Sequence, residues 1–535
     1  MHERAHQLKR RVIRLGWLRA KLRELVVTPY QVREFRRIAE YLPTPATAGE
    51  GPVILVLALR HWAISRAWEA VMSRMLLQEG CRVVWLECDR HLVRCDSMLG
   101  PRPDRGLCTH CVRFNRRVDE LTGVERVQLG DVAGVSEADR NDLAQRIADG
   151  PVEPAALERV RPSFQRIMGR TRRPVEQLDA PARQILDELL LSAELARLAA
   201  GPLFDRVKPS AVIALNGKFF AEAVLLEEAA RRGVPAWTYE RGNRRDTIVL
   251  APKPVAIPFD TDEIIAQLRD RPLTEPQQER LAGYLQSRNE VGNGQVRFLE
   301  PGAGQLPPVW LQSPRRLALF TNLIWDSAVV GEDTVFDDMF HWITRTVQAV
   351  AQDPATHLAI RVHPAEEKVY WHPTHDRVAD AIRGAFPEGL PANVTLIGPL
   401  EPVDSYELVR AADLVLAYAS SIGMEAAAMG KRVLVAANSA YSAAPFVIRA
   451  QSVEHYLAEL ADNSTGPAAP DGVELARRFI YRLYFEQMLR VPGVREDPTG
   501  FHFDAHDTAD GAELRDRLRE LARRASARRP ENLER

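Results

Sequence analysis

The sequence predicts an α/β protein with two facing Rossmann-like domains, an N-terminal helical arm and a C-terminal helical tail. From Pro52 onward, short apolar runs alternate with segments of helical periodicity, which is typical of a parallel sheet covered by helices. The alternation occurs in two successive series, separated by a proline-rich joint at 306–314. Because ligands of open parallel sheets bind at the strand ends, we expect a cleft between the two domains.

Composition and charge exclude several classes of protein. The 535 residues carry a formal net charge of −1, so we expect no nucleic-acid partner. The longest apolar runs are strand-length, far short of the roughly 18 residues that a membrane span needs. Residues 1–18 also lack the apolar core of a secretory signal. We therefore expect a cytoplasmic location.

Residues 1–48 are predicted to form a basic amphipathic helical arm. Apolar residues recur every three or four positions, at Leu8, Val12, Leu15, Leu18, Leu22 and Leu25. Eight Lys and Arg stand against two Glu between residues 1 and 28. This charge suits an interfacial helix on an anionic membrane, at the inner face of the plasma membrane. An arm packed on the protein's own surface is the alternative.

Residues 49–305 are predicted to form the first Rossmann-like domain. Its expected strands are 53–59, 82–87, 124–129, 211–216 and 236–240. Its expected helices are 64–78 and 219–232, with a mostly helical insertion at 138–198.

Residues 306–490 are predicted to form the second Rossmann-like domain. Its expected strands are 317–321, 357–362, 394–397, 414–418 and 433–436. Its expected helices are 334–351, 374–385, 405–411, 422–429 and 473–489. Residues 491–535 are expected to be a charged tail that ends in a fraying helix.

The first candidate site lies at the exit of a strand in the second domain. Arg361, His363 and Glu366 follow this buried strand, at the edge where ligands of open α/β sheets bind. Pro364 disfavours the helical conformation at His363, which keeps the imidazole at the strand exit. There it could donate to a phosphate or protonate a leaving oxygen. A purely structural histidine is the alternative.

A second strand exit in the same domain forms the other half of this site. Ser420 and Ser421 form the turn, and a helix with Glu425 in its first turn follows. Hydroxyl groups and a helix N-terminus favour a bound anion, while Glu425 could accept ribose hydroxyls. The alternative is a capping motif that serves only its own helix.

The motifs RVHPAE at 361–366 and YELVRAADLVLAYASSIGMEAAAMGKRVLV at 406–435, with the two-sheet plan, resemble a known family. This is the capsule polysaccharide biosynthesis family of bacteria, GT-B-type enzymes similar to capsule Kdo transferases and bacterial sialyltransferases. The resemblance covers 317–460 well and the first domain only in plan. It implies that His363 contacts the phosphate and leaving group of a CMP-activated sugar, and that Ser420 and Ser421 contact phosphate oxygens. We assign Arg361, Glu366, Gly423 and Glu425 to the same donor site.

The acceptor side is expected on the first domain. Asn216 and Lys218 follow one of its strands and Glu240 ends the next, so all three share one sheet edge. Glu240 loosely resembles the acidic residue before glycine in sialyltransferases and is the candidate general base. A surface ion pair of Glu240 with a neighbouring arginine is the alternative. Asp89, at the exit of another strand, is the competing base.

Four cysteines form a separate motif in the first domain. Cys88, Cys95, Cys108 and Cys111 are separated by six, twelve and two residues, which suits a closed tetrahedral metal site. Structural zinc is the leading candidate. An iron–sulfur cluster and free buried thiols are the alternatives.

The sequence therefore predicts a glycosyltransferase with an inverting mechanism. It would move a sugar from a nucleotide-activated donor, with CMP-sugars favoured, to a glycan or glycolipid acceptor in surface or capsular polysaccharide synthesis. His, Arg and Ser can neutralise the charge on the departing nucleotide, so we expect no cofactor or metal to be required for catalysis. A sugar-nucleotide epimerase of the same plan and a non-catalytic assembly scaffold are the alternatives.

Overall fold

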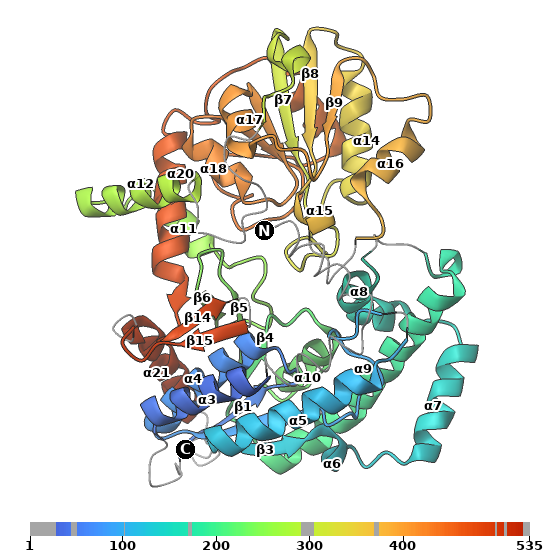
Figure 1. Cartoon of the computed structure of the whole chain (residues 1–535), viewed down its shortest axis with the longest axis vertical. Helices are drawn as coiled ribbons and strands as arrows, with labels where there is room; N and C mark the ends of the chain where they lie inside the picture. Colours follow the sequence, from blue (N-terminus) through green and yellow to red (C-terminus); the bar gives the residue numbers. More distant parts are fainter. Residues whose placement is uncertain are drawn as a thin grey trace.

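The computed structural model describes residues 28–43, 51–100, 102–169, 174–289, 304–368, 374–497, 500–507 and 511–527. Two sheets form the centres of two domains, one in the lower and one in the upper half of Figure 1. The prediction of two facing Rossmann-like domains is confirmed.

The first sheet has the strand order β13-β6-β5-β4-β1-β2-β3. Its strands are β1 (Val53–Leu57), β2 (Arg82–Glu87), β3 (Glu125–Gln128), β4 (Ala211–Leu215), β5 (Ala236–Arg241), β6 (Thr247–Ala251) and β13 (Leu489–Arg490). Strands β1 to β5 are parallel in the Rossmann order, in which the direction of progress reverses next to β1. The antiparallel strands β6 and β13 extend this sheet at one edge.

Helices cover both faces of the first sheet. Successive residues of β1 point to opposite faces, so Ile54 and Leu55 lie in different cores. This double burial explains why these strands read as unbroken apolar runs. One face carries α3 (Thr28–Tyr41), α4 (Ala63–Gln78) and α5 (Arg105–Thr122). The other carries α6 (Leu129–Ala133), α8 (Pro154–Met168), α9 (Ala180–Val207) and α10 (Phe220–Arg231), with α7 (Glu137–Asp149) packed on α9.

The second sheet is parallel throughout, in the order β12-β11-β10-β7-β8-β9. Its strands are β7 (Arg315–Phe320), β8 (Thr356–Arg361), β9 (Val394–Ile397), β10 (Leu414–Ala417), β11 (Arg432–Val435) and β12 (Ile448–Arg449). Its helices are α14 (Met339–Val350), α15 (Ala365–Lys368), α16 (Val378–Ala385), α17 (Ser405–Ala411), α18 (Ile422–Ala428), α19 (Val453–Ala461) and α20 (Gly472–Arg482). The strand order reverses between β7 and β10, which marks the expected ligand crevice.

The connection between the domains is helical in part. It contains α11 (Asp262–Ala266), α12 (Glu275–Asn289) and α13 (Pro308–Leu311). Apolar residues of this region, Leu268 and Trp310 among them, pack in the core on one face of the second sheet.

The described residues beyond 490, predicted as a charged tail ending in a helix, contain that helix but pack on the first domain. In Figure 1, α20 runs from the upper domain down to the lower one, and the π-helical turn Leu483–Gln487 then leads into β13 of the first sheet. The hairpin of β14 (Val494–Asp497) and β15 (Gly500–Phe503) and the helix α21 (Ala512–Ser526) also pack on the first domain. Leu514, Leu518 and Leu521 of α21 are fully buried beneath its highly charged outer face.

The described part of the predicted arm packs on the protein itself. Phe35 and Ile38 of α3 are fully buried, and Phe35 lies edge-on to Phe114 and Phe501. Residues 1–27, where the lipid-facing helix was predicted, lie outside the described residues, so membrane contact stays a prediction. Among the described residues, no helix combines the length and apolarity that spanning a bilayer would require.

Replacing Leu518 with alanine tests whether residues beyond 490 complete the first domain. Because Leu518 is fully buried against this domain, we expect Leu518→Ala to lower the free energy of unfolding by about 2–5 kcal/mol. Urea denaturation followed by tryptophan fluorescence measures the change. Arg523→Ala, at an exposed position of the same helix, should cost less than about 0.5 kcal/mol. Equal stability of the two variants would show that α21 is not part of the domain.

Candidate functional site

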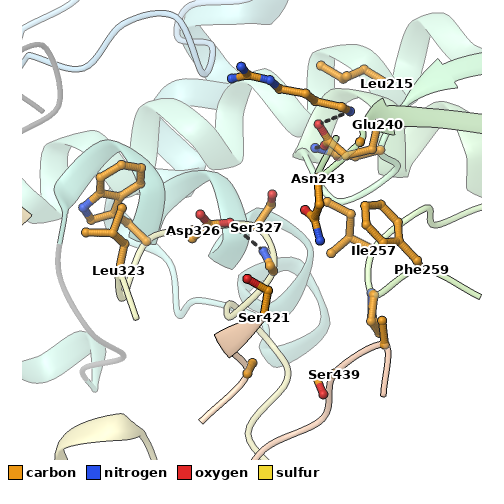
Figure 2. A pocket seen from close by; sticks show the side chains of 18 of the residues that line it. Leu215, Glu240, Asn243, Ile257, Phe259, Leu323, Asp326, Ser327, Ser421 and Ser439 are labelled. Atoms are coloured by element: carbon orange, nitrogen blue, oxygen red, sulfur yellow. Dashed lines mark hydrogen bonds between the residues drawn. The ribbon is translucent and has the colours of Figure 1, made fainter. Parts of the chain in front are cut away.

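A cavity of ≈ 550 Å³ lies where the carboxyl ends of the two sheets face each other. The first domain contributes residues that follow β1, β4 and β5, and the second contributes residues that follow β7, β8 and β10. Among these strands, β1 and β4 flank the reversal of strand order in the first sheet, and β7 and β10 flank that in the second, where ligands of such folds bind. Its volume lies within the range of small-molecule sites. In Figure 2, Glu240 lies on one side of this space and Asp326, Ser327 and Ser421 on another.

His363 lines the cavity as a neutral hydrogen-bond donor. The backbone N–H of Ala365 donates to its Nδ1 over 3.1 Å, so the proton of the neutral ring is on Nε2. Burial lowers the pKa of His363 to about 4, with the Asp326 carboxylate opposing this shift and the Arg361 guanidinium adding to it. The ring is therefore uncharged at pH 7.

Ser421 also lines the cavity, beside the first turn of α18. Its side chain makes no capping hydrogen bond to this helix, so the capping alternative is wrong for Ser421. Ser420 is placed differently, because its carbonyl accepts the Tyr441 hydroxyl and its side chain is not part of the cavity wall. The structure thus brings His363 and one of the two predicted serines to a single space.

Gly423 and Glu425 support this wall from behind. A Cβ atom at Gly423 would lie 2.3 Å from the Tyr441 hydroxyl, so a glycine is needed for Tyr441 to pack there. Glu425 accepts a hydrogen bond from the hydroxyl of Tyr406 at 2.5 Å. Neither residue lines the cavity, so the predicted donor contacts of both stay predictions.

Arg361 and Glu366 likewise turn away from the cavity. Arg361 donates to the carbonyls of Gly398 and Glu401, at 2.5 and 3.2 Å, and is buried. Glu366 accepts the backbone N–H of Val378 at 3.2 Å, and burial raises its pKa to about 7. The sequence identified the correct strand exit, but these two side chains lie beneath it and stabilise neighbouring loops.

Glu240 faces the cavity from the end of β5. It accepts hydrogen bonds from Asn216 Nδ2 at 3.0 Å and from the Arg241 backbone N–H at 2.7 Å. Burial nevertheless raises its pKa, which makes the carboxylate a better proton acceptor. The predicted alternative, a surface ion pair with a neighbouring arginine, is wrong, because Arg241 pairs with Glu496.

Lys218 joins the two domains. Its ammonium donates to the carbonyls of Ser327 and Val330, at 2.9 and 3.0 Å, and to Glu332 at 2.5 Å. The predicted acceptor contact is therefore wrong for Lys218, which is not part of the cavity wall. It instead holds the loop 321–338 that forms one side of the cavity.

Asp89 lies in a different place from the other candidate bases. It lines a second, smaller cavity together with Cys88, Cys95, Cys108 and Cys111, so it cannot serve the cleft between the domains. Burial raises the pKa of the Cys88 thiol to about 12 and that of Cys108 to about 11.

The fold gathers the four predicted thiols around that one small cavity. Among the described residues, however, no three His, Cys, Asp or Glu side chains are arranged to hold a metal ion. Zinc binding therefore stays a prediction that requires the thiols to draw closer.

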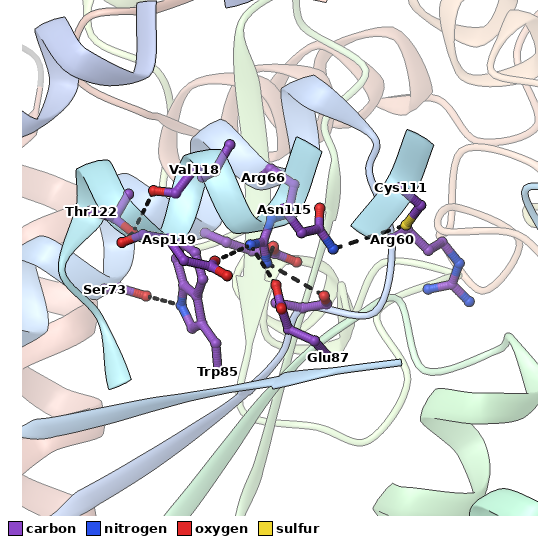
Figure 3. Close-up of polar contacts among 12 residues, drawn as sticks. Arg60, Arg66, Ser73, Trp85, Glu87, Cys111, Asn115, Val118, Asp119 and Thr122 are labelled. Atoms are coloured by element: carbon purple, nitrogen blue, oxygen red, sulfur yellow. Dashed lines mark hydrogen bonds and ion pairs between the residues drawn. The ribbon is translucent and has the colours of Figure 1, made fainter. Parts of the chain in front are cut away.

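A buried charge network lies near Cys111, as Figure 3 shows. The guanidinium of Arg66 donates to Glu87 at 3.0 Å and to Asp119 at 3.1 Å, and lies over the ring of Trp85. Asn115 contacts the sulfur of Cys111 at 3.9 Å. These contacts tie α5, which carries two of the cysteines, to β2.

Several cavity residues have no counterpart among the sequence predictions. The most polar of them are Arg166, Asn243, Asp326, Ser327 and Ser439. Asp326 and Ser327 belong to the loop after β7, which was partly assigned to a helix starting at 334, whereas α14 starts at Met339. The rule that identified His363, polar residues just beyond a buried strand, would also have identified this loop.

Comparisons with known proteins give limited guidance. No protein-family model matches the chain. No curated protein matches it significantly. Among solved structures it is similar to the beta Kdo 2,4 transferase of Thermosulfurimonas dismutans KpsC, at 17% identity over 58% of this chain and 87% of that one, with a TM-score of 0.37. It is also similar to the beta Kdo 2,7 transferase of the same protein, at 12% identity over 61% of this chain and 89% of that one, with a TM-score of 0.34.

A third similar structure is titled as a putative UDP-N-acetylglucosamine 2-epimerase from Listeria monocytogenes. It is 11% identical over 80% of this chain and 89% of that one, with a TM-score of 0.25. Scores at this level do not establish a shared activity.

The low pKa of His363 predicts a stability difference in acid. The unfolded imidazole, with a pKa near 6.5, takes up a proton before the native one does, so the native state loses stability as pH falls from about 6.5 toward 4. His363→Asn removes this loss. Between pH 7 and 5 the free energy of unfolding, measured by urea denaturation, should fall by about 1–2 kcal/mol more in the wild type than in the variant. His506→Asn, at an exposed position, should lose as much unfolding free energy over this pH range as the wild type. An equal loss in His363→Asn would contradict the assigned pKa.

Metal content tests the predicted thiol site. If the four cysteines hold zinc, the purified protein contains about one zinc per chain, and Cys111→Ser lowers this content because a tetrahedral site loses one of four ligands. Elemental analysis by mass spectrometry measures it. Cys81→Ala is the matched control, since Cys81 is buried outside this cavity. Metal-free protein, or equal metal in both variants, would refute the site.

Proposed function

We propose that the protein is a glycosyltransferase that moves a sugar from a nucleotide-activated donor to an acceptor hydroxyl, with inversion at the anomeric carbon. The observation that carries this proposal is the pairing of functions across one cavity. Glu240, a carboxylate of raised pKa, lies on the first domain, and the donors His363 and Ser421 lie on the second. In this proposal Glu240 acts as the proton acceptor, and His363 and Ser421 bind the anion from the other domain.

The second domain binds the donor phosphate in this proposal. As the bond between sugar and phosphate breaks, its electron pair stays with the nucleotide, and negative charge grows on the departing oxygen. The Nε2–H of His363 and the hydroxyl of Ser421 can donate to such an oxygen from fixed positions. A CMP-sugar is the first candidate donor, because the His-Pro and paired-serine motifs resemble those of CMP-sugar enzymes. We propose that this step needs no metal ion.

The first domain binds the acceptor and removes its proton. The acceptor oxygen forms the new bond to the anomeric carbon while its proton passes to Glu240, which balances the charge left on the nucleotide. Trp62, Trp68 and Phe219 line the cavity on this side and offer apolar faces on which a sugar ring can pack. We propose a glycan or glycolipid acceptor of surface or capsular polysaccharide. A glycolipid would bring the enzyme to the inner face of the plasma membrane.

Two variants separate nucleotide binding from transfer. CMP, CDP, UDP and GDP are first compared for their ability to raise the melting temperature, since a ligand of the native state stabilises it. His363→Ala should abolish the shift given by the best nucleotide. Glu240→Gln should keep this shift but lower the rate of nucleotide release from the matching sugar nucleotide, with bacterial glycolipid as acceptor, by about 10²–10⁴-fold.

Asp89→Asn is the control for these measurements, because Asp89 lies outside the cleft. Wild-type rates in Glu240→Gln would remove Glu240 from the mechanism. Formation of isomeric sugar nucleotides without any acceptor would identify an epimerase instead. If no nucleotide shifts the melting temperature of the wild type, the donor site is refuted.

A further inference from the structure

Arg166 presents a guanidinium on the wall of the cleft that the carboxylates of Asp96, Asp326 and Glu240 influence without pairing with it. It belongs to the last turn of α8 and lines the same cavity as Glu240 and His363. The part of the chain that the structure describes provides no hydrogen-bond or ion-pair partner for its guanidinium, and the buried Nε has no acceptor. Burial lowers the pKa of Arg166, although the carboxylates of Asp96 and Asp326 oppose this shift. A ligand anion in direct contact with the guanidinium would stabilise its charged form further.

Neighbouring cations are neutralised within the fold. Arg60 bonds to Glu222 and, at 2.8 Å, to Asp96. Lys218 pairs with Glu332. The lack of such a partner therefore distinguishes Arg166 from these basic residues near the cleft.

Two aromatic rings hold Arg166 without using its N–H donors. Its Cζ lies 5.5 Å from the ring centre of Trp62 and 5.6 Å from that of Phe219, which are themselves in edge-to-face contact. Cation–π contact fixes the position of a guanidinium while leaving its planar fork available. A cation near the C-terminal end of α8 interacts favourably with the helix dipole, but a solvent-exposed arginine would make this interaction equally well.

Arg166 lies on the acceptor side of the cavity. Its positive charge acts on Glu240, whose pKa it lowers against the effect of burial. The charges that act on His363 come instead from Asp326 and Arg361. Trp62 and Phe219, which contact the guanidinium, belong to the first domain, so Arg166 lies on the wall of the proposed acceptor site.

We propose that Arg166 binds an oxyanion group of the acceptor, the carboxylate of an acidic sugar or a sugar phosphate, and so selects negatively charged acceptors. The identification of the ligand as an acceptor rests on the proposed function, but anion binding at Arg166 can be tested independently of that function. A planar guanidinium binds either group through two parallel hydrogen bonds. With the anion held there, the sugar ring lies against the aromatic wall and one of its hydroxyls can reach Glu240.

Three small probes test this site in the full-length protein. Glucuronate, glucose 6-phosphate and glucose are titrated while tryptophan fluorescence is followed, because Trp62, Trp68 and Trp325 line the cavity. The wild type should bind at least one of the anionic probes about 10-fold or more tightly than glucose, as expected for charge-assisted hydrogen bonds. Which anion binds better distinguishes a carboxylate from a phosphate group. Arg166→Met should bind all three probes equally weakly.

Arg159→Met is the matched control, since Arg159 lies on the same helix and pairs with Glu227 on the surface. It should keep the wild-type preference, and the nucleotide that shifts the melting temperature should do so equally in wild type and Arg166→Met. A preference that survives in Arg166→Met, or is missing from the wild type, would overturn the proposal. Loss of the nucleotide shift alone would place Arg166 in the donor site. If Arg166→Met does not fold, Arg166→Lys and Arg166→Gln are compared, and the preference must persist in the first and vanish in the second.

Discussion

The ammonium of Lys218 reaches from the first domain into the loop 321–338 of the second, where two carbonyl oxygens and the carboxylate of Glu332 surround it. A largely buried ammonium is tolerated only with such a complete set of partners, so this contact favours one path of the loop and one separation of the domains. Asn438 donates to the other oxygen of Glu332 at 2.7 Å and fixes the loop from the opposite side. The position of Asp326 and Ser327 in the cavity wall follows from these contacts. The same contacts also set the distance between Glu240 and the second domain.

Within that frame, burial acts in opposite directions on two titratable groups. It raises the pKa of the Glu240 carboxyl and lowers that of the His363 imidazole, because a low-dielectric surrounding disfavours whichever form is charged. The same surrounding strengthens every hydrogen bond made to a bound anion. Proton affinity and anion affinity in the cleft thus have one physical origin, the removal of water by the two facing sheets.

The sequence predicted most of the fold because its signals are local. The strands Arg82–Glu87 and Val394–Ile397 were located to the residue. The first contains an unbroken apolar run between charged ends, as expected for a strand buried on both faces. The strand-exit rule found His363, Ser421 and Glu240, because parallel strands all end at one edge. It could not tell that Arg361 and Glu366 point beneath that edge, which depends on packing against loops distant in sequence. It predicted a helix where α21 lies but not the packing of this helix on the first domain, and it missed Arg166, which reaches the cleft only through tertiary packing of the insertion.

The return of the chain from α20 into β13 and α21 has a consequence for synthesis. A ribosome completes β6 long before β13, and at about 5–20 residues per second the interval spanned by residues 252–488 takes about 10–50 s. During that time the outer edge of β6 is unpaired and the apolar face of α4 lacks the cover that α21 later gives. The nascent first half must therefore wait, incompletely closed, for the second half to emerge. Such a chain needs protection from association with its neighbours, by chaperones or by the charged residues that surround its exposed edge.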